Sequence, residues 1–176
     1  MPSELYEKIV AQRGRLEKLV ARIPGFKGYQ EKQARRTADR MLRDHISEQL
    51  DQRLDHLIRI EKRILDGGGL MMMSATRSAK TKLQTYRDRV KTAAPKYDGM
   101  WAQVKIGTDE LDKIYAFDEA QLSYLDSIDA ALDILEKSIG SNEDMRTALD
   151  GLTAAVEEAN DAFQLRDDVI LGFETE

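Results

Sequence analysis

The chain has 176 residues, of which 34% are charged and 6% aromatic, and it contains 3 prolines and no cysteine. At this length a single domain covering residues 1–176 is expected, and the composition favours long amphipathic helices over a β-sandwich or a disordered tail. Without cysteine the protein cannot form disulfides, thiolate metal sites or iron–sulfur clusters, and it has no cysteine nucleophile.

The formal net charge of −5 conceals a division into two oppositely charged halves. The basic half, residues 1–98, contains 22 Lys and Arg against 13 Asp and Glu and carries a charge of +9. The acidic half, residues 99–176, contains 5 against 19 and carries a charge of −14. This asymmetry predicts either that the halves neutralise one another in the fold or that the basic half meets an anionic partner.

The apolar segments are too short for a transmembrane helix. The longest uninterrupted one is residues 70–73, whereas a transmembrane helix requires about 20 apolar residues. Near the N-terminus the chain carries Glu4 and Glu7, where a secretory signal would have a positive segment followed by an apolar run. We therefore expect a cytoplasmic location.

Helical periodicity of apolar residues runs along almost the whole chain, and we predict about five helices. The first covers residues 3–23 and is ended by Pro24, which disfavours helix at the residue before it. The second covers residues 29–65 without proline or glycine, and at 1.5 Å per residue it would be about 55 Å long. Three glycines at positions 67–69 end it.

Three further helices are predicted after these glycines. One covers residues 73–93 and is stopped by Pro95, and the aromatic connector at 96–107 should form a short helical turn over the end of the bundle. The next two, residues 108–139 and 141–171, are joined by so short a loop that they must run antiparallel as a hairpin. The prediction is an all-α fold, an elongated antiparallel helical bundle whose second, fourth and fifth helices are the longest.

No catalytic or phosphate-binding motif was recognised in the sequence. The glycines at 67–69 lack the lysine of a phosphate-binding loop and follow a helix instead of a strand, so we interpret them as a hinge. The two histidines, His45 and His56, would be about 16 Å apart along one helix, which is too far to share a metal ion. We therefore expect no enzyme activity, no cofactor, no metal site and no small-molecule substrate.

A stripe of positive side chains on the second predicted helix is a candidate binding site. Four of its members fall within about 80° of the helix circumference, a fifth lies beside them, and Lys27 extends the stripe through the corner before the helix. This basic stripe comprises Lys27, Lys32, Arg35, Arg36, Arg40 and Arg43. Such a stripe can bind nucleic acid or anionic lipid head groups; alternatively, it is solvated or pairs with the acidic half. No aromatic residue that could stack on bases accompanies it, which favours the second interpretation.

Two charged residues interrupt the apolar seams of the predicted hairpin. Asp118 occupies a core position of the helix at 108–139, and Arg166 does the same in the helix at 141–171. With the turn near Gly140, the two positions lie at nearly the same level. Because an uncompensated buried carboxylate is costly, we predict a buried Asp118–Arg166 salt bridge that fixes the register of the two helices.

Long charged helices without a catalytic constellation favour a non-catalytic scaffold or adaptor that binds another protein or further copies of itself. The alternative is a binding module for nucleic acid or an anionic membrane surface, acting through the basic stripe. From the sequence, the identity of the partner, the oligomeric state and the biological process stay open.

Overall fold

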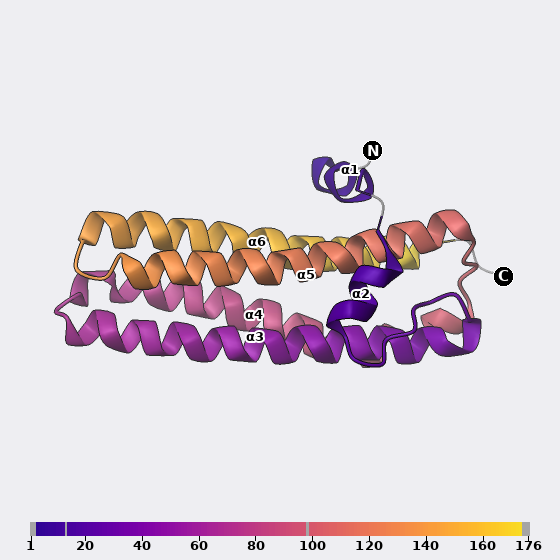
Figure 1. Ribbon diagram of the computed structural model, residues 1–176, viewed down its shortest axis with the longest axis horizontal. Coiled ribbons are helices and arrows are strands. Elements are labelled where there is room, and N and C mark those ends of the chain that lie inside the picture. The colour runs from indigo at the N-terminus through magenta and orange to yellow at the C-terminus, as the bar shows by residue number, and fades with distance from the viewer. Residues whose placement is uncertain (1–2, 13, 98, 174–176) are drawn as a thin grey trace.

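The computed structural model describes residues 3–12, 14–97 and 99–173, and six α-helices form this part of the protein. Four are long and lie side by side in an elongated bundle (Figure 1). They are α3 (Arg35–Asp66), α4 (Met73–Tyr97), α5 (Thr108–Lys137) and α6 (Asn142–Leu171). Two short helices, α1 (Glu4–Val10) and α2 (Leu16–Arg22), pack against α5 from outside. The predicted all-α elongated bundle is confirmed, with six helices where about five were expected.

The four long helices are arranged as a square. α3 packs against α4 and α5, and α6 packs against the same two helices, so α3 and α6 lie on one diagonal. α5 and α6 run antiparallel and are joined at Gly140, whose φ of +108° is a conformation that glycine adopts without strain (Figure 1). The longest helices are α3, α5 and α6, with 32, 30 and 30 residues, as predicted.

Apolar residues spaced three and four apart give each long helix one buried face. On α3 this face includes Leu42, Ile46 and Leu50, all fully buried. α6 begins where the Ser141 hydroxyl accepts a hydrogen bond from the Asp144 N–H at 3.3 Å, the cap expected from the sequence. Within the described residues, no helix is both long enough and apolar enough to cross a membrane.

The single helix predicted for residues 3–23 is wrong, because α1 and α2 are separate. Gly14 lies between them, packed on the backbone of α5, where a Cβ atom on residue 14 would be 2.1 Å from the Ala116 nitrogen. Only a residue without a side chain can approach so closely. The chain leaves helical geometry at this point to make the contact.

The helix predicted to begin at residue 29 begins later, at Arg35. Tyr29 is fully buried, and its ring stacks on that of Trp101 with the ring centroids 5.4 Å apart. Its backbone N–H donates to the Tyr115 hydroxyl at 3.0 Å. A short 3-10 turn, Lys32–Ala34, then leads into α3. Because Tyr29 is held in these contacts, the chain around it is not helical, and α3 begins only at Arg35.

The connector between α4 and α5 covers one end of the bundle. α4 runs to Tyr97, two residues beyond Pro95, which was expected to stop it. The predicted helical turn is present as Met100–Ala102, and Trp101 is buried within it. At this end of the bundle Trp101 therefore stacks on Tyr29, which contacts the buried charges described next.

Candidate functional site

Charged side chains are buried where α3, α5 and α6 meet. Arg166 Nε donates to Asp118 Oδ1 over 2.6 Å, and both side chains are 0% exposed. The Tyr29 hydroxyl donates to the other Asp118 oxygen at 2.6 Å and accepts from Arg166 Nη2 at 3.1 Å. The structure thus brings together the two residues paired in the sequence analysis and adds Tyr29 to them.

Two carboxylates and a second arginine complete this cluster. Arg166 also contacts Asp39 at 2.8 Å and Asp167 at 3.1 Å. Arg43 binds the same two carboxylates, at 2.9 Å and 2.7 Å. The buried ion network consists of Tyr29, Asp39, Arg43, Asp118, Arg166 and Asp167. It joins α3 to α6 across the diagonal of the bundle and α6 to its neighbour α5.

Burial and neighbouring charges shift the pKa values of the three carboxyl groups in different directions. Burial opposes ionisation of Asp39, but Arg166 and Arg43 outweigh it, and its pKa lies below the ordinary value. Burial dominates at Asp118 and Asp167, whose pKa values are raised although Arg166 lies beside both. Three carboxylates face two guanidinium groups, which is why they do not all ionise equally readily. Every member is buried, so the network serves the fold.

Two of the six residues assigned to the basic stripe lie inside the fold, so that part of the prediction is wrong. Arg43 is 1% exposed, because it points toward α6 and joins the buried ion network. Arg35 is 5% exposed, and its Nε donates to the Tyr29 carbonyl oxygen at 2.9 Å. The exposed members of the stripe are Lys27, Lys32, Arg36 and Arg40.

Ion pairs outside the buried ion network also join the two oppositely charged halves of the chain, and in one of them, Arg53–Asp129, the cation is itself buried. Each of these pairs takes its cation from residues 1–98 and its anion from residues 99–176. The pairs are Lys8–Glu158, Lys18–Glu119, Arg22–Asp126, Arg53–Asp129, Arg63–Glu136 and Lys82–Glu157. They support the interpretation that the basic half finds its counter-charges within the same fold.

His56 lies beside two acidic residues of α5. Its Nε2 is 3.1 Å from Glu136, and with Asp133 the three potential ligand atoms lie within 4.8 Å of one another. Arg63 binds the other oxygen of Glu136 at 2.6 Å, and its positive charge opposes the binding of a cation there. We interpret these residues as an ion-pair cluster between α3 and α5.

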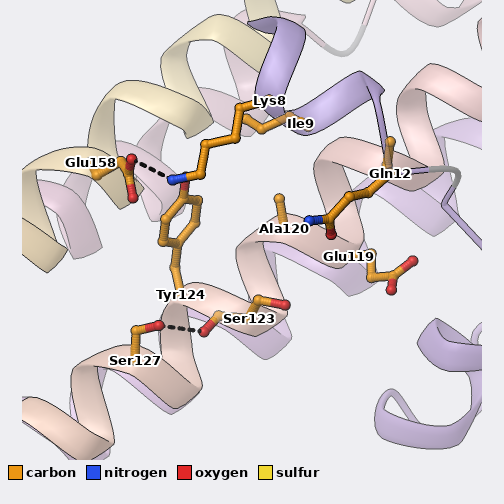
Figure 2. Close-up of a pocket in the computed structure, with 10 residues that line it drawn as sticks. Lys8, Ile9, Gln12, Glu119, Ala120, Ser123, Tyr124, Ser127 and Glu158 are labelled. Carbon is orange, nitrogen blue, oxygen red and sulfur yellow. Dashed lines mark hydrogen bonds and ion pairs between the residues drawn. The ribbon is translucent and has the colours of Figure 1, made fainter. Parts of the chain in front are cut away.

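A pocket of about 220 Å³ lies beneath α1 (Figure 2). Lys8 and Ile9 form its α1 side, and the Lys8 ammonium contacts Glu158 of α6 at 2.9 Å. Tyr124 of α5 lines it, and burial, followed by the charge of Glu158, raises the pKa of this phenol. The volume is below the roughly 300–1,000 Å³ of small-molecule sites. The Ser127 hydroxyl donates to a backbone oxygen one turn earlier at 3.1 Å.

A groove of about 690 Å³ continues from this pocket between α5 and α6 toward their turn, and Ser127 lines both spaces. Most of its lining side chains are small. They include Ser127, Ala130 and Ala131 on α5 and Ala148, Gly151 and Ala155 on α6. Ile134 also lines it and is 60% exposed. This surface, the α5–α6 groove, therefore has a mostly apolar floor with the exposed side chain of Ile134 on it, and Lys137 and Asp144 line it near the turn.

Gly151 lies in the middle of α6, where glycine weakens a helix by roughly 1 kcal/mol relative to alanine. A Cβ atom at this position would meet no atom within 4 Å, so the chain has room for a side chain. The glycine therefore opens the α5–α6 groove without serving the packing of the bundle.

Comparisons with protein-family models, with curated proteins and with solved structures find no match to this chain. A function must therefore be inferred from the structure itself. The features available are the α5–α6 groove, the helix α1 beside it and the exposed positive residues near the start of α3.

Proposed function

We propose that the protein is a non-catalytic cytoplasmic adaptor whose α5–α6 groove binds a helix of a protein partner. The observation that carries the proposal is α1, a helix of this chain that already lies against α5 and α6 next to the groove. Ile9 is buried in that contact, and the Tyr6 ring lies 6.1 Å from the Phe117 ring of α5. This face thus accepts a helix, and the α5–α6 groove continues it beyond α1.

The spacing of the groove residues suits a helix. Ala148, Gly151 and Ala155 are three and four residues apart, as are positions along the seam of a coiled coil. Ala131 and Ile134 on α5 are three apart and face the same groove. Because these side chains are mostly small, a partner backbone can approach closely, and the approach would bury the exposed part of Ile134.

A role without catalysis is supported by the way the described residues use their charged groups. The members of the buried ion network contact one another and are closed to solvent. The pocket beneath α1 is small, and many surface carboxylates face cations of the basic half. These groups stabilise the fold and its helix contacts.

Photo-cross-linking in cells tests the proposal. A cross-linking amino acid is placed at Thr147, an exposed residue that lines the groove, and in a matched control at Ala75, an exposed residue of α4. We expect adducts with a helical segment of a protein from Thr147 and none from Ala75. The purified captured protein should bind the wild type and not Gly151→Arg. Absence of adducts from Thr147, equal capture from both positions, or binding that survives Gly151→Arg would contradict the proposal.

The alternative proposal is the binding of nucleic acid or anionic lipid head groups through the exposed members of the basic stripe. Co-sedimentation with anionic vesicles and with nucleic acid at increasing salt distinguishes it. Binding that falls steeply with salt and is lost when Arg36 and Arg40 are changed to Glu would support it. Absence of binding at low salt would remove it.

A further inference from the structure

We propose that α1 is a displaceable helix that closes one end of the α5–α6 face, and that the partner helix pushes it aside when it binds. The inference rests on the proposed function and names how the same site is regulated. α1 contacts both α5 and α6, and the pocket beneath it meets the α5–α6 groove at Ser127. α1 and a helix bound in the groove therefore use one surface.

The outer face of α5 carries a single stripe of residues that begins beneath α1 and continues along the groove. They are alternately four and three residues apart, which is the spacing of a coiled-coil seam. The residues of this stripe that line the pocket beneath α1 or the groove are Ala116, Ala120, Ser123, Ser127, Ala130 and Ile134. From Ile134 to Ser123 the stripe runs about 16 Å, so a partner helix that lies on Ile134 and follows the stripe reaches α1 within about three turns.

α1 is held by few contacts. It has 7 residues, fewer than the roughly 12–15 that an isolated helix needs in water, so its contacts with the bundle keep it helical. Within α1, Ile9 alone is buried. The ion pair of Lys8 with Glu158 is exposed, and pairs of this kind contribute little to stability. The pocket of about 220 Å³ lies between part of α1 and α5 (Figure 2). Little free energy is therefore needed to detach α1.

The chain that follows α1 is fixed to α5 independently of it. Gly14 packs on the α5 backbone, and the Arg15 N–H donates to Glu119 of α5 at 3.2 Å. In α2, Leu19 is fully buried and Arg22 binds Asp126 of α5. The four long helices contact one another directly. α1 can therefore leave its place while α2 and the bundle stay as they are.

The affinity of the whole chain for a purified probe, the protein captured by the Thr147 cross-link, tests the inference. Ile9→Asp puts a carboxylate into the apolar contact of α1 and should detach it. This variant should bind the probe on the order of tenfold more tightly than the wild type, because apparent affinity is the intrinsic affinity multiplied by the fraction of molecules whose site is open. Val20→Asp is the matched control, since Val20 is 48% exposed on α2, and it should bind like the wild type. Circular dichroism verifies that both variants keep their helices.

A tether should produce the opposite change. Because the chain has no cysteine, Lys8→Cys and Glu158→Cys can be joined selectively by a short bismaleimide that holds α1 on α6. The tethered protein should bind the probe about tenfold more weakly than the same double variant before tethering. A cross-linking amino acid at Ser123, which lines the pocket beneath α1, should capture the probe before tethering and not afterwards.

The inference is overturned if Ile9→Asp binds the probe no more tightly than the wild type, or if tethering changes neither the affinity nor the capture from Ser123. Either result, with adducts still formed from Thr147, would leave the proposed function standing. Absence of adducts from Thr147 would contradict the proposed function and remove this inference with it.

Discussion

At the scale of single residues, the buried ion network makes Asp118 important for stability. Asp118→Ala should lower the free energy of unfolding by about 3–5 kcal/mol, because it removes the carboxylate closest to the buried Arg166. Asp126→Ala is the matched control on the same helix; Asp126 binds Arg22 in an exposed pair, so its loss should cost at most about 1 kcal/mol. Urea denaturation measures both. Equal losses of unfolding free energy in the two variants would contradict the conclusion that the buried ion network is shielded from water.

His45 should give the stability a pH dependence. It is half-buried in α3, and burial, then the positive charge of Arg22, lower the pKa of its imidazole below the ordinary 6.5, against the opposing charge of Glu48. Its contribution to stability is therefore present above pH 6.5 and is lost as the pH falls through the folded-state pKa. Between about pH 7 and 5, wild type should lose more stability than His45→Gln in urea denaturation. Parallel pH profiles would show that His45 titrates normally.

The burial of Asp118 and Arg166 could be predicted from the sequence, because each of them interrupts an apolar seam on its own helix. The burial of Asp167 could not be predicted in this way, because Asp167 is next to Arg166 in the sequence and off that seam. Asp167 is buried by its contact with Arg43 of α3, and this contact between distant helices leaves no mark in the local pattern.

A signal for Asp39 and Arg43, two further members of the buried ion network, was present in the sequence. Asp39, Arg43, Ile46 and Leu50 are four, three and four residues apart, which is the spacing of a buried face. Grouping Arg43 with the basic stripe overlooked this spacing. The separation of exposed from buried charges on α3 could therefore have been made before the structure was known.

At the scale of the elements, two glycines should respond to alanine in opposite ways. Gly14→Ala should lower the free energy of unfolding by about 1–3 kcal/mol, because its Cβ atom would overlap the backbone of α5. Gly151→Ala should raise it by about 0.5–1 kcal/mol, because that space is empty and alanine favours the helix. Urea denaturation measures both changes. Changes of the same sign would contradict these assignments.

The long helices were predictable because the spacing of apolar residues follows from the face that each helix buries. The predicted helix boundaries are wrong where contacts between segments distant in the sequence determine the backbone conformation. The break at Gly14 exists because residue 14 packs on α5, and α3 starts late because Tyr29 is held against Trp101. Neither contact follows from a local pattern.

At the scale of the whole molecule, the two oppositely charged halves are joined by two kinds of ion pair. Exposed pairs such as Arg22–Asp126 are screened by salt, whereas the buried ion network is shielded from it. The destabilisation by Asp126→Ala should therefore vanish in high salt, while that by Asp118→Ala should persist. Urea denaturation at low and high sodium chloride measures the difference. A loss of the Asp118→Ala effect in high salt would mean that solvent enters the network.

Binding through the α5–α6 groove is tested most directly by the isoleucine methyl signals in NMR spectra recorded as the protein captured by the Thr147 cross-link is added. The Ile134 methyl signal should shift as the captured protein is added to the wild type and stay at its original position in Gly151→Arg. The signal of Ile58, exposed on α3, should stay fixed in both. An Ile134 signal that does not move, or a shift of Ile58 in its place, would contradict the assignment of this groove as the binding surface.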